Sequence, residues 1–452
     1  MCLDLFLRFV KFYQKSLGHN LFIQAYAGLF MEGKPGDKVR IVTLKEEING
    51  ILLESPNPDI ALVKLDSGYN IGVVKENIKH FEIVEKFKIA ETNEGYKMSE
   101  NNGLPKIDVI MTGGTIASRL DTKTGAVKWL TKPEEFFQFY PELFEIVNVK
   151  NVKNPFLMAS EDMSASQWIE IARVVEESLK DNEVSGVIVT HGTDFLGYTA
   201  AAFSFFLGKL NKPVVLTYSQ RSSDRASSDA SLNMLCAGQA AISDIAEVMI
   251  VGHGSINDDF CFALRGVKAR KMHTSRRDTF RPINASPIAK IWPGKIEIIG
   301  GFRKKNEGKI DSDIVFNEKV ALVKFYPGMN PDILDYYNQY FEGIVLEVSG
   351  LGHLSVEGKY NWIPKIKKAI DNGLVICAAP QTLYGQLDPL VYSPGRALMD
   401  AGVIYLEDML PETALVKLGW VLGHKQWKLK VKEKMLENFA GEFNKRLGVE
   451  FC

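Results

Sequence analysis

The chain has 452 residues, of which 46% are hydrophobic and 24% charged, as in ordinary globular proteins. This length allows one to three domains with a large buried core. A formal net charge of −1 excludes a global field that would draw the protein onto nucleic acid or an anionic membrane, and leaves only a local basic patch open. The five cysteines are scattered and form no CxxC pair, which argues against a disulfide framework or a structural zinc site and favours a reducing cytoplasm.

The amino end allows two interpretations. Residues 1–30 are apolar, but charged side chains interrupt them, and no apolar stretch reaches the roughly 20 residues that span a bilayer. A signal peptide fits poorly, because the apolar run comes too early and no small-residue cleavage site closes it. Either these residues form an N-terminal extension, or translation starts at Met31, immediately before the turn-rich EGKPGD, and they are absent from the protein.

A small all-β domain is predicted over residues 31–86. Short β-type runs (KVRIV, INGILLES and DIALVKLDSGYNIGVV) alternate there with turn residues such as Asp66-Ser67-Gly68, a spacing typical of a small barrel rather than of βαβ units. Residues 87–105 are polar and contain Asn101-Asn102-Gly103 before Pro105, so we expect them to be a linker.

From residue 106 the pattern becomes α/β. Apolar strands (IDVIM, GVIVT, PVVLT and EVMIV) alternate with helical segments over 106–302, which predicts a doubly wound, mostly parallel sheet covered on both faces. The helix after Ser164 shows the pattern clearly, with Ser164 as its cap. A charged connection over 303–319 leads to a smaller α/β domain over 320–452, with strands VALVKF, GIVLEV and LVICA and a charged amphipathic helix at its end.

Two strands end in glycine and hydroxyl residues. The strand Ile107–Met111 runs into Thr112-Gly113-Gly114-Thr115, and the strand Gly186–Thr190 runs into His191-Gly192-Thr193-Asp194. Ligands of open α/β sheets bind beyond the carboxyl ends of strands, where glycines expose backbone N–H groups. A threonine hydroxyl placed there can act as a nucleophile, with N–H groups near Gly114 and Thr193 stabilising an oxyanion. The alternative for each motif is an ordinary turn with a capping residue, but two such ends in one sheet favour a site.

Together, TGGTIAS and HGTD resemble the two signatures of the asparaginase and glutaminase family. Further matches follow in the expected order over about residues 107–425. Met158–Met163 is similar to the substrate-binding loop, which implies that Ser160 and Glu161 hold the substrate's amino and carboxyl groups with Asp194 and Gly114. Lys271 lies in a segment similar to the one that carries the catalytic lysine.

The family resemblance implies a mechanism. Thr115 would attack the side-chain amide and form an acyl-enzyme, while Thr193, Asp194 and Lys271 would activate a hydroxyl or water and move protons. A lysine acts as a base only in its neutral form, which desolvation or a nearby cation favours. Without the resemblance, Lys271 would be interpreted as a solvated charge in a basic run, which could also face nucleic-acid phosphates or a partner protein. That run comprises Arg265, Lys268, Arg270, Lys271, Arg276 and Arg277.

One departure concerns the step that activates Thr115. The family usually carries a tyrosine on a mobile lid just after TGGT, and the stretch Arg119–Lys128 has none. Gly125 and the polar composition still suit a lid. Thr122 is a candidate activator by position alone, and Lys271 or a water is the alternative. His191 and His273 are expected to be hydrogen-bonding scaffold rather than general bases.

The β domain ahead of TGGT distinguishes the chain from ordinary asparaginases. Its layout, with segments such as GDKVRI and SQRSSDRASSDA, resembles the D subunits of archaeal glutamyl-tRNA(Gln) amidotransferases. The resemblance implies a chain that hydrolyses glutamine or asparagine and gives ammonia to a partner, the E subunit, which would use ATP and Mg²⁺ to amidate Glu-tRNA(Gln). It also implies a homodimer core within a heterotetramer, with tRNA bound mainly by the partner and no association with a membrane.

The absent motifs agree with this division of labour. The sequence has no GxxxxGK[ST] loop, no GxGxxG after a strand, no GxSxG elbow and no HExxH helix, so we expect no nucleotide or metal site in this chain. A free-standing asparaginase with an added β domain is the main alternative. A catalytically silent scaffold or RNA-binding module is a third interpretation, which the retained threonines, aspartate and lysine disfavour.

Overall fold

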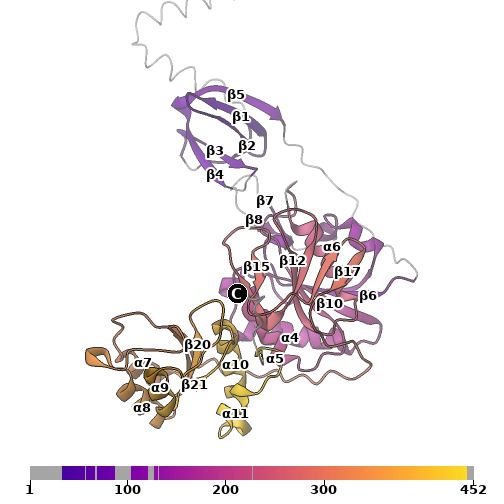
Figure 1. Ribbon diagram of the computed structural model, residues 1–452. Helices are drawn as coiled ribbons and strands as arrows, with labels where there is room; N and C mark the ends of the chain where they lie inside the picture. Colours follow the sequence, from indigo (N-terminus) through magenta and orange to yellow (C-terminus); the bar gives the residue numbers. More distant parts are fainter. Residues whose placement is uncertain are drawn as a thin grey trace, which may run out of the picture. The chain divides into compact units, whose positions relative to one another are not determined.

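The computed structural model describes residues 33–86, 103–225 and 228–444, except 56, 67, 68, 121–126 and 131. Residues 1–32 with Met31, most of the linker and residues 445–452 lie outside the described residues. The chain divides into two compact units (Figure 1). The first comprises Met1–Gly95, Ser118–Lys128 and Asp224–Ser227, and the second Tyr96–Ala117, Trp129–Ser223 and Ser228–Cys452.

The small domain is an antiparallel five-stranded sheet with the order β4-β3-β2-β1-β5, so the all-β prediction is confirmed. In β1, Val39 and Ile41 are buried while Lys38 and Arg40 are exposed, as expected when one face of a strand covers a core. That core consists of Val39, Ile41, Ile48, Leu52, Ala61, Val63 and Val73. The strands are β1 (Lys38–Thr43), β2 (Glu47–Leu53), β3 (Ile60–Leu65), β4 (Asn70–Val74) and β5 (Ile78–Glu85).

The second unit begins with an eight-stranded sheet of order β17-β16-β13-β12-β11-β10-β6-β9. The five strands from β12 to β9 are parallel, and the other three continue the sheet antiparallel. The predicted apolar strands therefore form the parallel part. The bounds are β6 (Lys106–Met111), β9 (Asn148–Lys153), β10 (Val184–Thr190), β11 (Val214–Thr217), β12 (Val248–His253), β13 (Cys261–Arg265), β16 (Ala289–Trp292) and β17 (Lys295–Ile298).

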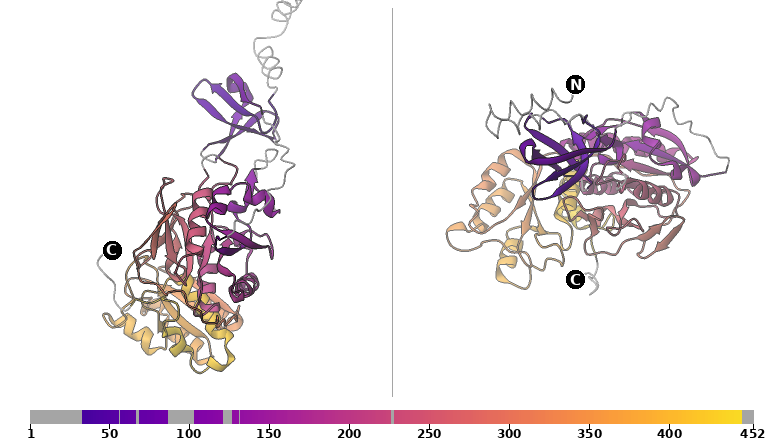
Figure 2. Two further views of the ribbon diagram at one scale, coloured as in Figure 1. Left: turned by 90° about the vertical axis from the view of Figure 1, so that its right-hand side faces the viewer. Right: turned by 90° about the horizontal axis from the view of Figure 1, so that it is seen from above.

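Helices cover both faces of this sheet, as predicted (Figures 1 and 2). Val187 and Val189 of β10 pack on one side with α4 and α5, and Ile188 packs on the other with α3 and α6. Ser164 caps α4 in a capping box with Gln167, which confirms the predicted start of that helix. The helices are α3 (Pro133–Phe137), α4 (Ala165–Lys180), α5 (Leu196–Phe206) and α6 (Ala230–Ala241).

The second lobe of this unit is a parallel four-stranded sheet, β18-β19-β20-β21. Helix α10 is buried nearly all round and packs on α5 of the first lobe, where Trp420 stacks on Phe205 with ring centroids 5.5 Å apart. The closing helix α11 has only six residues. The bounds are β18 (Val320–Lys324), α7 (Ile333–Tyr340), β19 (Gly343–Val348), α8 (Ile363–Asp371), β20 (Val375–Pro380), α9 (Ser393–Asp400), β21 (Ile404–Tyr405), α10 (Pro411–Gly423) and α11 (Val431–Leu436).

Short elements complete the chain. Two hairpin-like pairs, β7 with β8 and β14 with β15, lie outside the main sheets. Their bounds, with those of the 3₁₀ turns, are η1 (Lys75–Asn77), η2 (Thr115–Ala117), β7 (Ser118–Leu120), β8 (Val127–Trp129), η3 (Pro141–Glu145), η4 (Ser160–Asp162), η5 (Gly266–Lys268), β14 (Ala269–Lys271), β15 (Phe280–Pro282), η6 (Gly358–Tyr360) and η7 (Lys425–Trp427).

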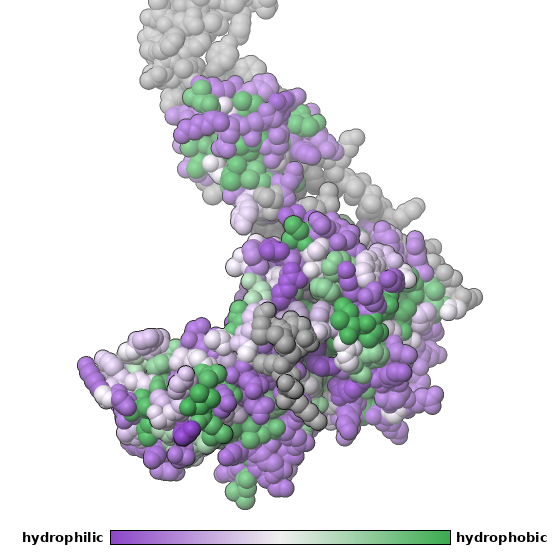
Figure 3. All heavy atoms as spheres, in the orientation of Figure 1, coloured by the Kyte–Doolittle hydropathy of each residue, from purple (hydrophilic) through white to green (hydrophobic). Residues whose placement is uncertain are grey.

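Hydrophilic and hydrophobic residues are interspersed on the face drawn in Figure 3. No helix in the described part of the chain combines the length and the apolar character needed to cross a membrane.

Candidate functional site

The TGGT turn begins where β6 ends. The Thr112 hydroxyl is buried and donates to the Thr190 carbonyl, 2.7 Å away, which ties this turn to the end of β10. Gly113 and Gly114 then take positive φ angles of 118° and 81°, a conformation that side chains disfavour. Thr115 follows at the start of η2, half-buried. The turn therefore presents Thr115 at the carboxyl edge of the sheet.

The HGTD turn lies directly beside it. In the parallel pairing of β6 with β10, Met111 is opposite Thr190, so both strands end at the same level. A Cβ atom on Gly114 would lie 2.6 Å from the backbone nitrogen of Gly192. The two backbones thus touch at these glycines, and Thr115 and Thr193 each come one residue later. The structure brings together the two motifs that the sequence placed on separate strands.

The Ser160 loop completes the same edge. The Met158 N–H donates to the Thr112 carbonyl over 3.0 Å, and a Cβ atom on Gly113 would lie 2.5 Å from the Met158 carbonyl oxygen. Ser160 is buried, and its hydroxyl accepts the N–H of Phe195 at 3.3 Å. Glu161 is exposed beside it. Ser160 and Glu161, two of the four predicted substrate-binding residues, therefore lie next to the HGTD turn.

His191 is held as an uncharged scaffold. Its Nδ1 lies 2.8 Å from the Gly192 carbonyl, and its Nε2 lies 2.9 Å from the Thr199 hydroxyl. Burial lowers the pKa of His191 to about 4, so the ring is neutral at pH 7. With Nδ1–H donating to Gly192 and Nε2 accepting from Thr199, neither nitrogen is left for a substrate. The ring fixes the HGTD turn, which confirms the prediction for His191.

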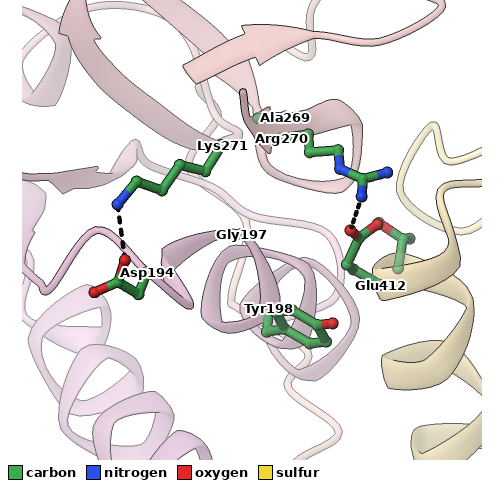
Figure 4. A pocket seen from close by; sticks show the side chains of 8 residues that line it. Asp194, Gly197, Tyr198, Ala269, Arg270, Lys271 and Glu412 are labelled. Atoms are coloured by element: carbon green, nitrogen blue, oxygen red, sulfur yellow. Dashed lines mark hydrogen bonds and ion pairs between the residues drawn. The ribbon is translucent and has the colours of Figure 1, made fainter. Parts of the chain in front are cut away.

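Lys271 reaches this turn from a different element. It ends β14, and its Nζ donates to Thr193 Oγ1 over 2.8 Å. The same Nζ donates to Asp194 Oδ1, also over 2.8 Å (Figure 4). The Lys271 side chain is 15% exposed, so the interpretation as a solvated charge is wrong. The alternative in which Asp194 merely caps α5 is also wrong, because no side chain caps that helix and Asp194 accepts the lysine instead. Three predicted catalytic residues form one hydrogen-bonded group.

The basic run around Lys271 is largely neutralised. Buried Lys268 pairs with Asp408 at 2.6 Å, and desolvation lowers its pKa. The other members also have carboxylate partners: Arg265 with Glu247, Arg270 with Glu412, Lys271 with Asp194, Arg276 with Asp278 and Arg277 with Asp258. His273 accepts the N–H groups of Ser275 and Arg276 at its Nδ1, as a turn scaffold. The run is therefore not an unbalanced positive patch.

A cavity of about 150 Å³ lies beside Lys271, between the two lobes of the second unit (Figure 4). Successive residues of a strand point in opposite directions, and accordingly Lys271 turns to Asp194 while Arg270 turns to Glu412, 3.2 Å away. Burial, with the charge of Glu412, raises the pKa of Tyr198 to about 12, so its phenol stays protonated. The lining residues are Asp194, Gly197, Tyr198, Ala269, Arg270, Lys271, Glu412 and Thr413.

The expected lid is described only at its ends. β7 and β8 pair there, whereas residues 121–126, with the candidate Thr122 and with Gly125, lie outside the described residues. The described residues contain no group of three or more His, Cys, Asp and Glu side chains placed to hold a metal ion.

Two residues near Thr115 were missed from the sequence. The hydroxyls of Tyr140 and Ser223 both lie 2.7 Å from the Ile116 carbonyl, one residue after Thr115. Nothing in the sequence near Tyr140 indicates this contact. Ser223 belongs to the polar segment SQRSSDRASSDA, which resembled the amidotransferase D subunits but carried no assigned role.

Three family models match consecutive parts of the chain. They are the GatD N-terminal domain at residues 33–84, the N-terminal asparaginase domain at 106–302 and the glutaminase/asparaginase C-terminal domain at 319–435. The D subunit of the glutamyl-tRNA(Gln) amidotransferase of Thermococcus kodakarensis is 48% identical over 419 residues, which cover 90% of this chain and 94% of that one. The corresponding protein of Pyrococcus furiosus is 49% identical over 418 residues, with the same coverage.

Solved structures of asparaginases share the fold. The thermostable L-asparaginase from Thermococcus kodakarensis superposes with a TM-score of 0.68 at 28% identity, and covers 75% of this chain and 100% of its own. L-asparaginase I from Vibrio cholerae gives a TM-score of 0.65 at 26% identity, with 75% and 99% coverage. The asparaginase-like architecture is thus confirmed, and these enzymes account for three quarters of this chain.

Proposed function

Because this chain belongs to the family of glutamyl-tRNA(Gln) amidotransferase D subunits, we propose that it is the glutaminase component of such an enzyme. One observation carries the chemistry. Lys271 Nζ donates to both Thr193 and Asp194 at the strand end that touches Gly114, directly before Thr115. This geometry supports a reaction in which Thr115 is the nucleophile and the Lys271 group transfers protons at the same edge of the sheet.

The reaction proceeds in two steps. Thr115 Oγ1 attacks the side-chain carbonyl carbon of glutamine and gives up its proton. The C–N bond then breaks, and the departing –NH2 group takes up one proton and leaves as ammonia. Water then hydrolyses the threonine ester, which releases glutamate and restores the hydroxyl. The Thr193–Lys271–Asp194 group moves protons in these steps, and backbone N–H groups near Gly114 and Thr193 stabilise the oxyanion.

The substrate's α-amino and α-carboxyl groups are held by Ser160, Glu161 and Asp194, beside Gly114. Asparagine is the competing amide donor, because one methylene changes binding in a pocket by only about 1–3 kcal/mol.

The rest of the amidation belongs to a partner. This partner, the E subunit, would bind ATP and Mg²⁺, activate the glutamyl group of Glu-tRNA(Gln) and receive the ammonia, with two copies of this chain at the core of a heterotetramer. The enzyme would work in the cytoplasm, where reduced thiols such as the buried, free Cys236, Cys261 and Cys377 persist. A free-standing asparaginase leaves the N-terminal β domain at residues 33–84 without a role.

The test separates glutamine use from amidation. In the reconstituted complex, Thr115→Ala and Thr193→Ala should each abolish glutamine-dependent formation of Gln-tRNA, while amidation with added ammonium chloride continues at the wild-type rate. Thr217→Ala is a matched control, since Thr217 ends the next strand at the same edge and its hydroxyl donates only to the Val251 carbonyl among the bonds described. Equal loss with both nitrogen sources would contradict the proposal, as would strong amide hydrolysis by the isolated chain that neither tRNA nor partner alters.

A further inference from the structure

Three oxygen atoms meet beside the turn that carries Thr115. The Tyr140 hydroxyl lies 2.7 Å from the Ile116 carbonyl oxygen, the Ser223 hydroxyl lies 2.7 Å from the same oxygen, and the two hydroxyls are 2.7 Å apart. These side chains come from distant parts of the chain and converge on one peptide group of η2. That peptide group follows Thr115 by a single residue.

Either hydroxyl alone can supply a hydrogen bond to the Ile116 carbonyl. A carbonyl only accepts, and the two hydroxyls supply one proton each, so at most two of the three contacts are hydrogen bonds at any moment. If either hydroxyl is removed, the other can still donate to the Ile116 carbonyl. Only the loss of both leaves this carbonyl without either donor.

Both hydroxyls are positioned by packing or by hydrogen bonds nearby. Tyr140 is 1% exposed and packs against the ring of Phe136, with centroids 4.8 Å apart. Burial raises the pKa of Tyr140, so it stays a donor and does not serve as the base that the missing lid tyrosine would supply. Ser223 lies in a loop shaped by buried Asp229, whose carboxylate accepts the N–H groups of Gln220 and Arg221.

The peptide group that they hold is part of the turn itself. Ile116 is fully buried, and the next N–H, that of Ala117, donates to the Gly114 carbonyl at 3.1 Å and closes the turn around Thr115. A rotation of the Ile116 peptide would therefore move the Thr115 side chain. Misplacing a reacting group by about 1 Å can lower a rate roughly 100-fold.

We propose that Tyr140 and Ser223 are positioning residues, which act as a redundant clamp on the Ile116 carbonyl and thereby aim Thr115 at the amide. The inference rests on the proposed role of Thr115 as the nucleophile. Its signature is non-additivity, because each single variant keeps one of these two donors and the double variant keeps neither.

The experiment is a double-mutant cycle in the full chain, assembled with its ATP-using partner. For Tyr140→Phe, Ser223→Ala and the double variant, we would measure kcat and KM for glutamine, the rate at which a diazoketone analogue of glutamine labels Thr115, and the midpoint of thermal unfolding. Each single variant should stay within about threefold of the wild type. The double variant should lose about 100-fold in kcat and in labelling rate, with KM within about twofold.

The controls separate aiming from stability. Tyr405→Phe with Ser243→Ala removes two hydroxyls that also donate to carbonyls at 2.7 Å, away from the site. It should alter the unfolding midpoint but not the labelling rate. Tyr140→Phe with Ser223→Thr keeps one hydroxyl and should restore the rate. If the double variant does not fold, Tyr140→Phe with Ser223→Cys keeps a weak donor, and its labelling rate should fall between those of Tyr140→Phe and an inactive enzyme.

Two failures are distinguishable. A double variant that labels and turns over as fast as either single variant overturns the clamp, and so does a loss that the control pair reproduces. A Thr115→Ala chain that still hydrolyses glutamine overturns the proposed function instead, whatever the clamp variants do.

Discussion

Replacing Gly114 with alanine tests whether contact between the TGGT and HGTD turns is needed for activity. The new Cβ would lie 2.6 Å from the carbonyl oxygen of His191 and from the nitrogen of Gly192. Both are backbone atoms, so no side chain can rotate away. To reach an ordinary contact of about 3.4 Å, the turns must separate by roughly 0.8 Å, a displacement for which about 100-fold loss of kcat is expected.

The backbone angle adds a second cost, which a control removes. Gly114 has a φ of 81°, where alanine costs about 1–2 kcal/mol. Gly294, in the turn between β16 and β17, has a φ of 78°, but a Cβ atom added there would have no atom within 4 Å. Gly294→Ala should therefore show the strain alone, as a lower midpoint of urea unfolding with unchanged kcat.

The assay is glutamine hydrolysis under saturating substrate, beside urea unfolding of both variants. Gly114→Ala should lose about 100-fold in kcat and be less stable than Gly294→Ala. If Gly114→Ala keeps more than about a third of the wild-type kcat while remaining folded, the two turns need not touch, and the argument that Thr115 and Thr193 act at one edge would be refuted.

Two further predictions concern stability. Burial lowers the pKa of His191 from 6.5 to about 4, so between these values the unfolded chain binds the proton and the folded chain does not. The free energy of unfolding should therefore fall by about 3 kcal/mol as the pH drops from 6.5 to 4. In His191→Asn, the free energy measured by urea unfolding should change less with pH over this range. Parallel pH profiles for the variant and the wild type would contradict this prediction. Lys268→Met leaves Asp408 buried without its cation and should cost about 3–5 kcal/mol of unfolding free energy. As the control, Lys295→Met removes an exposed ion pair with Glu297 and should cost less than about 1 kcal/mol. Equal losses in the two variants would show that burial of the ion pair does not matter.

The strands could be predicted from the sequence because each carries its own signal. Runs such as GVIVT are mostly apolar, as expected for strands of a parallel sheet that is buried on both faces, and they became β6, β10, β11 and β12. The sequence also predicted that both threonine motifs lie at the same edge of the sheet, because the carboxyl ends of parallel strands share one edge. Local composition was sufficient for these features.

The adjacency of the two motifs could not be predicted in the same way. β9 comes between β6 and β10 in the chain, yet it pairs on the far side of β6, so that β10 becomes the neighbour of β6. Strand order is decided by packing over the whole sheet. The clamp on Ile116 could not be predicted either, because Tyr140 and Ser223 are 83 residues apart in the sequence and come together only in the folded chain.

The end of the chain shows a similar limit. We expected a charged amphipathic helix there, and α11 is a helix of only six residues. The chain then folds back, so that Glu442 pairs with Lys417 of α10 at 2.7 Å with both side chains fully buried. Glu442 also accepts the N–H groups of Phe439 and Ala440, which holds this segment in a non-helical form. Helical periodicity in a sequence carries no sign of a buried ion pair.

The basic run around Lys271 shows how a site can be hidden in an ordinary pattern. From the sequence, these cations were most simply interpreted as solvated or as facing phosphate, because nothing local reveals a partner. In the structure each has a carboxylate, and strand geometry sends Arg270 and Lys271 in opposite directions, to Glu412 and to Asp194. Arg270 is paired with Glu412, whereas the amine of Lys271 also donates to the hydroxyl of Thr193, which we propose to be catalytic. The run therefore contains the proposed proton-transfer group, Lys271, and surrounds it with paired charges.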